Sequence, residues 1–290
     1  MQTNINENVF RYGIYIECVN KVSRFLFPVL FAFPLVTFPH ADLELQINVV
    51  TAQIAAEPDN YLLYEKRGHL HRRHSNYLAA LRDFEKISKI DPENENTEFH
   101  VGRTLYESGQ ADKAVTHLRE FLRHHPQHSA ALLVFARTLS DLGHVDEASD
   151  YYRRSINNAP VKTPDQFVEW SQLFLQPNSK RPADARDVLN EGIAQLGPVV
   201  SLVDHTVSLQ QSIGDYGEAI RHLKLLPDEL QTTPKWLVKQ ADCVYALGDL
   251  EQSTHLYHQA LEEITALPQA RRQLPAMLEL KIYIDAKLSS

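Results

Sequence analysis

Small, bulky and polar residues recur in the same order in successive stretches of residues 61–267. Each stretch has an amphipathic segment that carries a small residue, then a turn, then a second segment that opens on a small residue. A bulky apolar residue follows four positions later, which places both residues on one face of a helix. The pattern predicts pairs of helices joined by turns, and therefore an all-α fold.

The spacing of prolines and alanines gives the length of one unit. Successive prolines lie 34 residues apart, and so do successive alanines of the second helix. Proline ends the second helix of a unit, and a glycine in the turn ends the first helix. The residues that set this period are Pro58, Pro92, Pro126 and Pro160, then Ala80, Ala114 and Ala148, and the glycine pairs Gly109/Gly143 and Gly214/Gly248.

Counting from Tyr61 gives six units, of which the fourth is irregular. Ala148 and Ala185 are 37 residues apart, and residues 176–182 form an enlarged turn. Trp170 also occupies a position that is small in other units. The predicted units are 61–94, 95–128, 129–162, 163–199, 200–233 and 234–267.

These features resemble the tetratricopeptide repeat family, in which a small residue, an alanine, an aromatic residue and a closing proline recur at this period. The match is best over residues 61–162. The resemblance implies a right-handed superhelical solenoid of about six helix-turn-helix repeats, with first helices that line a concave groove. Solenoids need end elements with one polar face, so we expect terminal capping helices in segments 42–60 and 268–290.

The first 41 residues differ from the rest of the chain. Lys21 and Arg24 precede an apolar run of 14 residues at 25–38, and a small residue, Ala41, follows. The run is shorter than the roughly 20 apolar residues that span a bilayer, so it predicts a signal peptide over residues 1–41. We expect an exported protein, located in a bacterial periplasm. The alternative is an uncleaved anchor in the inner membrane that tethers an assembly factor facing the periplasm.

Charge and motifs argue against several classes of function. The net charge of −8 is opposite to the basic surface that holds nucleic acid. The chain contains no GxSxG, P-loop, GxGxxG or HExxH motif, and Cys18 and Cys243 lie far apart in the sequence. We therefore expect no enzyme activity, no cofactor, no metal ligands and no small-molecule substrate. The histidine pairs His71/His74 and His255/His258 leave a histidine-dependent metal-binding protein as an alternative.

Basic side chains gather on the first helices of the first three units. The ninth position of these units holds His69, Arg103 and Arg137, and Arg72 and Arg73 follow His69 by about one turn. Because a guanidinium group donates to both oxygens of a carboxylate, we expect these residues to bind an acidic segment or chain-end carboxylate of a partner protein or peptide. The alternative is a solvated face, on which Glu65, Glu107 or Asp141 neutralises some of these residues.

Aromatic residues replace the basic ones in the fourth unit, where Phe167, Trp170 and Phe174 lie on the first helix. They are candidate anchors for an apolar part of the partner, and the competing interpretation is that they form core. The sequence thus predicts an exported scaffold for protein–protein interactions. By analogy with the family, we expect a role in assembly or maturation of cell-envelope components.

Overall fold

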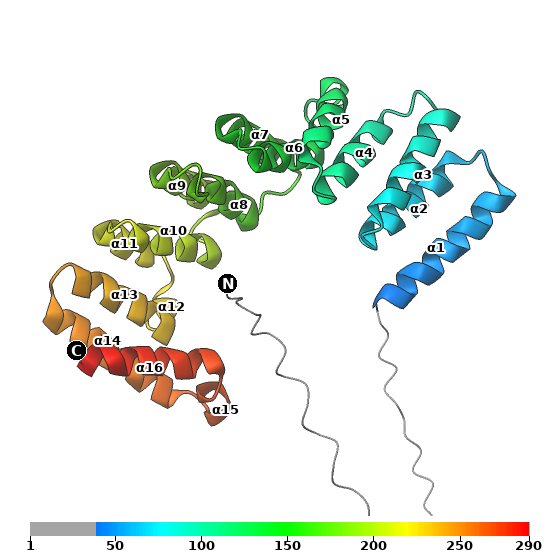
Figure 1. The fold of residues 1–290 in the computed structure, drawn as a ribbon. Coiled ribbons are helices and arrows are strands. Elements are labelled where there is room, and N and C mark those ends of the chain that lie inside the picture. The colour runs from blue at the N-terminus through cyan, green and yellow to red at the C-terminus, as the bar shows by residue number, and fades with distance from the viewer. Residues whose placement is uncertain (1–38, 290) are drawn as a thin grey trace, which may run out of the picture. The chain divides into compact units, whose positions relative to one another are not determined.

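The computed structural model describes residues 39–289, and within that range all regular elements are α-helices (Figure 1). The apolar run at 25–38 lies outside the described residues. None of the helices between residues 39 and 289 has the length and apolar character needed to cross a bilayer. The helices are α1 (Pro39–Ala56), α2 (Tyr61–Arg73), α3 (Tyr77–Ile90), α4 (Asn96–Glu107), α5 (Ala111–His124), α6 (Ser129–Asp141), α7 (Val145–Asn158), α8 (Pro164–Leu175), α9 (Pro182–Leu196), α10 (Val200–Ser212), α11 (Tyr216–Leu223), α12 (Asp228–Gln231), α13 (Pro234–Ala246), α14 (Leu250–Ala266), α15 (Gln269–Arg272) and α16 (Pro275–Ser289).

Adjacent helices pack in pairs, and each pair packs on the next. The pairs are α2 with α3, α4 with α5, α6 with α7, α8 with α9, α10 with α11, and α13 with α14. Along the curve that α4 to α11 follow in Figure 1, the first helix of each pair lies on the inner side and the second on the outer side. The predicted all-α solenoid of helix pairs is confirmed.

The small residue of the first helix allows the second helix to approach closely. A Cβ atom added to Gly68 would lie 2.6 Å from the ring of Phe84, and one added to Gly102 would lie 2.8 Å from Leu118. Both apolar side chains are fully buried. Because glycine has no Cβ, a bulky side chain of the second helix packs directly against the backbone of the first.

A residue with left-handed backbone lies in the turn between the two helices of every pair. Glycine is favoured there because other residues carry a Cβ that crowds the following carbonyl. In two pairs the residue is not glycine, and the spacing of glycines in the sequence did not predict these two positions. The six residues are Ser75, Gly109, Gly143, Lys180, Gly214 and Gly248, with φ from 50° to 91°.

In the irregular fourth pair, α8 and α9 pack against each other in a different way. Trp170 is only 1% exposed, and its indole Nε1 donates to Ser149 Oγ at 2.9 Å. Here the small residue is on the second helix, since a Cβ on Gly192 would lie 2.8 Å from Phe167. A large residue on the first helix is therefore matched by glycine on the second.

The terminal helices cover the two ends of the array. Val50 and Ile54 of α1 join the core of the first pair, and Ile284 of α16 is buried against the last pair. The opposite side of α16 exposes Leu278 and Ile282. Each terminal helix thus has one face in a hydrophobic core, as a capping helix requires.

Candidate functional site

Side chains of α2, α4, α6, α8, α10 and α13 form one surface, called here the first-helix face. At its start, the α2 side chain Arg72 donates through Nη1 to Glu107 Oε1 of α4 at 2.6 Å. Arg103 donates through Nε to the same oxygen at 2.9 Å. One carboxylate therefore neutralises part of the charge of two arginines from neighbouring units.

Arg137 on α6 makes a two-pronged ion pair with the next first helix. Its Nε and Nη2 each lie 2.6 Å from an oxygen of Glu169 on α8. Tyr152 of α7 donates to Glu169 Oε1 at 3.0 Å. The bond to Glu169 raises the pKa of Arg137 above its ordinary value, and burial raises the pKa of Tyr152.

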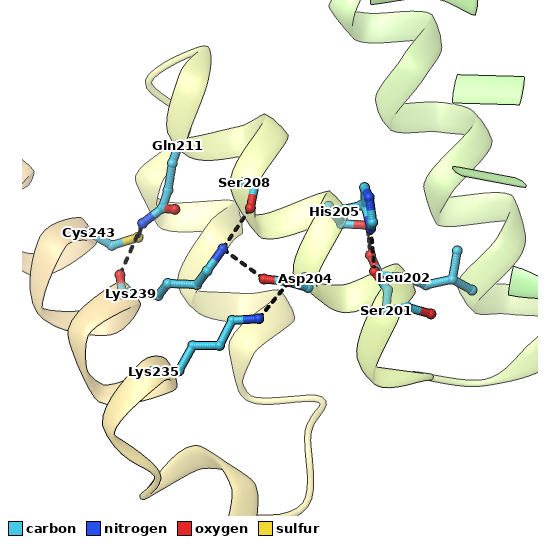
Figure 2. Close-up of polar contacts among 10 residues, drawn as sticks. Ser201, Leu202, Asp204, His205, Ser208, Gln211, Lys235, Lys239 and Cys243 are labelled. Atoms are coloured by element: carbon cyan, nitrogen blue, oxygen red, sulfur yellow. Dashed lines mark hydrogen bonds and ion pairs between the residues drawn. The ribbon is translucent and has the colours of Figure 1, made fainter. Parts of the chain in front are cut away.

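The same arrangement recurs between α10 and α13 (Figure 2). Lys235 and Lys239 of α13 reach the two oxygens of Asp204 on α10 at 2.7 and 2.8 Å. Lys239 also donates to Ser208 at 2.6 Å. Burial acts to raise the pKa of Asp204, but the bonds from both lysines outweigh it, so that pKa lies below its usual value.

A hollow of about 170 Å³ opens on this face beside the Arg137–Glu169 pair. Its lining includes an amide, Gln172, a carboxylate, Asp141, and the phenol of Tyr106. Burial raises the pKa of Asp141 and of Tyr106. The lining comes from α4, α6, α7 and α8, so the hollow spans three successive units. Its residues are Tyr106, Arg137, Ser140, Asp141, Tyr152, Glu169, Gln172, Leu173 and Gln176.

The predicted basic residues all lie on the first three units, but they are not a free positive stripe. Arg73 is exposed, whereas Arg72, Arg103 and Arg137 are each held by a carboxylate. His69 is half-buried, with its ring 4.5 Å from that of His100. Binding of a partner by these residues stays a prediction. An acidic partner would compete with Glu107 and Glu169 for the arginines.

The predicted aromatic anchors lie elsewhere than expected. Phe167, Trp170 and Phe174 are 0%, 1% and 4% exposed and belong to the largest core cluster. The expectation that they face a groove is therefore wrong in this structure. Their helical spacing is that of a core-facing stripe, because the fourth pair uses these rings to fill the space between α7, α8 and α9.

The histidine pairs and Cys243 can also be compared with the structure. Among the described residues, the group with metal-ligand geometry is Glu65, His69 and His100, not the pairs singled out from the sequence. Sequence spacing missed it because His69 and His100 lie in different units. Cys243 is buried, and burial raises the pKa of its thiol, as expected of an unreactive cysteine.

Solved structures show what this arrangement of helices is similar to. The C-terminal part of a TPR repeat-containing protein from Cytophaga hutchinsonii superposes with a TM-score of 0.60 at 15% identity, covering 80% of this chain and 95% of that one. The described residues therefore have the fold of tetratricopeptide repeat (TPR) proteins. A family model described as anaphase-promoting complex, cyclosome, subunit 3 matches residues 73–155 of the TPR array.

Two other TPR structures are similar at lower scores. A tetratricopeptide repeat protein from Parabacteroides merdae has a TM-score of 0.49 at 16% identity, covering 83% of this chain and 93% of that one. YrrB, described as a TPR protein with an unusual peptide-binding site, has a TM-score of 0.44 at 11% identity, covering 62% and 91%. No curated protein sequence matches the chain significantly.

Proposed function

We propose that this TPR protein is an exported scaffold that binds a segment of a partner protein on its first-helix face. The observation that carries the proposal is the hollow beside Arg137, which spans three successive units. Its lining offers donors from Gln172 and Tyr106 and an acceptor from Asp141, groups that match the backbone and side chains of an extended peptide. The TPR fold itself is that of a scaffold rather than of a catalyst.

The partner segment in this proposal is acidic. Arg103 and Arg137 keep 39% and 37% of their side chains exposed, although each is paired. A carboxylate of the partner that replaces Glu107 at Arg103 exchanges one charged hydrogen bond for another. The cost of separating the resident pair is therefore small, and the charge of the segment decides its preference for this surface.

A display library of random peptides tests the binding face. Selected peptides are expected to be rich in Asp and Glu and to lose about tenfold in affinity, about 1.4 kcal/mol, for the double variant Arg103→Gln/Gln172→Ala. Lys113→Gln on α5 is the matched control, since it removes an exposed charge from a second helix. Equal affinity for the double variant and the wild type would place binding on another surface.

Export and a role in assembly or maturation of the cell envelope are part of the same proposal. The support is the apolar run at 25–38 with its preceding Lys21 and Arg24. The mass of the protein purified from its native host is expected to correspond to a chain that begins at Asp42. A full-length mass in the membrane fraction would favour the tethered assembly factor instead, and the binding face would be unaffected by that result.

A further inference from the structure

Two imidazoles and one carboxylate from neighbouring units converge between α2 and α4. Glu65 and His69 lie one turn apart on α2, and His100 lies on α4. Glu65 Oε1 is 3.0 Å from His100 Nε2 and 3.7 Å from His69 Nε2. One ligand atom of each residue lies within 4.8 Å of the others.

This spacing is close to that of a tetrahedral zinc site. Nitrogen and oxygen ligands lie about 2.0–2.2 Å from zinc, which places neighbouring ligand atoms about 3.3–3.5 Å apart. The two separations from Glu65 fall on either side of that value. The ligand nitrogens of His69 and His100 lie within 4.8 Å of each other, so an ion bound to all three residues requires the two rings to turn toward it.

The exposure of the site also suits a metal. The side chains of Glu65, His69 and His100 are 28%, 34% and 12% exposed, which leaves one side open for the ion and a water ligand.

The tautomer of His69 is not fixed by a hydrogen bond at Nδ1. This atom is buried and has no hydrogen-bond partner within residues 39–289. The proton therefore resides on either ring nitrogen without loss of a bond at Nδ1, and Nε2, which faces Glu65, is available as the unprotonated ligand atom. The ring is instead held edge-on against Phe84 and His100, which keeps Nε2 directed at the carboxylate.

Arg72 and Arg103 set the limit on affinity. Both place positive charge near His69, and both are paired with Glu107. A single carboxylate in the ligand set, near two guanidinium groups, holds a divalent ion less tightly than a closed site with more anionic ligands. The site is thus suited to reversible binding.

We propose that Glu65, His69 and His100 form a three-ligand site for a divalent transition-metal ion, with zinc as the ion that the spacing fits and water as the remaining ligand. The bound ion joins the first helices of the first two units through one centre. This inference is independent of the proposed scaffold function, because Glu65, His69 and His100 do not line the hollow and take no part in the Arg137–Glu169 ion pair.

The test uses the full chain without a purification tag, stripped with a chelator and titrated with zinc chloride by calorimetry at neutral pH. Cobalt chloride serves as a second probe, since a tetrahedral site with nitrogen and oxygen ligands gives cobalt characteristic visible absorption bands. We expect one ion per chain for the wild type and for the control His255→Gln, which changes an exposed histidine of α14. For His100→Gln we expect a loss of more than about a hundredfold in affinity, above the range found for outer-shell changes.

His69→Gln provides an independent removal of one ligand, and circular dichroism shows whether either variant remains helical. A helical variant that binds zinc as tightly as the wild type overturns the proposal and assigns the ion to other histidines, such as the pair His71/His74. The absence of stoichiometric zinc from the stripped and reloaded wild-type chain overturns it as well. If a variant unfolds, the wild-type cobalt spectrum decides, because bands of octahedral intensity contradict the proposed site.

Discussion

At the scale of single residues, the turn between the two helices of a unit demands one left-handed backbone position. Four units meet this demand with glycine, while Ser75 and Lys180 meet it with a side chain attached. Left-handed backbone costs a residue with a Cβ about 1–2 kcal/mol. The left-handed positions occupied by glycine could be predicted from the sequence. The positions of Ser75 and Lys180 could not, because serine and lysine do not indicate a left-handed backbone.

We predict that Lys180→Gly raises the free energy of unfolding by about 1 kcal/mol, since relief of the strained φ outweighs the added freedom of the unfolded chain. Urea denaturation measures the change. Lys180→Ala is the control, because it removes the same exposed charge and keeps the Cβ. An equal gain for the alanine variant would show that charge, not backbone conformation, sets the stability of this turn.

His100 of α4 gives a second prediction at this scale, made for the protein from which a chelator has removed metal ions. The pKa of His100 is lowered to about 4, below the ordinary value near 6.5, so the unfolded chain binds more protons between these values. Stability is then complete above about pH 6.5 and falls as the pH decreases toward 4, by about 1–2 kcal/mol between pH 7 and pH 5. Urea unfolding at both pH values should show this loss in the wild type and a smaller one in His100→Gln. The same pH dependence in both proteins would assign it to other groups.

At the scale of elements, ion pairs between first helices fix each unit against the next. The sequence predicts where the arginines lie, because they follow the period of the units. It offered Glu107 only as one of three nearby carboxylates and missed Glu169, although each lies about one unit from the arginine that it holds, Arg72 and Arg137. A search for carboxylates one period away from each cation would have found both.

These pairs predict unequal effects of charge reversal. Arg137→Glu should lower the free energy of unfolding by about 1–3 kcal/mol, because it leaves the partly buried Glu169 beside a second carboxylate. Arg103→Glu should have a smaller effect, since Glu107 keeps Arg72 as a partner. Urea denaturation compares the two variants. Equal losses would mean that the two-pronged geometry at Arg137 adds nothing to stability.

At the scale of the whole described array, the core is a row of clusters rather than a single centre. The largest runs from α4 to α10, and separate clusters lie at α1 to α3 and at α13, α14 and α16. The repeat period predicts this row, because each unit packs only on its neighbours. The period does not predict the burial of Phe167, Trp170 and Phe174, since the fourth unit departs from the pattern that assigns faces to its positions. Their spacing as one helix face did indicate it, as the interpretation that competed with an anchor role.

We predict that loss of one terminal contact has a local effect. Ile284 is fully buried against the last pair, and Ile284→Asp places a charge there. Amide hydrogen exchange should become at least about tenfold faster in α13, α14 and α16 and stay unchanged in α4 to α8. Ile282→Asp, on the exposed side of α16, is the control. Uniformly faster exchange would show that the array opens as one cooperative unit.

The enlarged turn between α8 and α9 carries a practical consequence for work on this molecule. The fourth unit accommodates three extra residues at this point, since Ala148 and Ala185 lie 37 rather than 34 residues apart, and the flanking helices still bury Trp170 and Ala185. A longer loop here is thus compatible with intact packing on either side. The exposed tip of the turn, at Pro177 and Asn178, is a suitable place to graft an epitope or a fluorophore, which would report on the protein inside cells while Gln176, which lines the hollow on the first-helix face, stays in place.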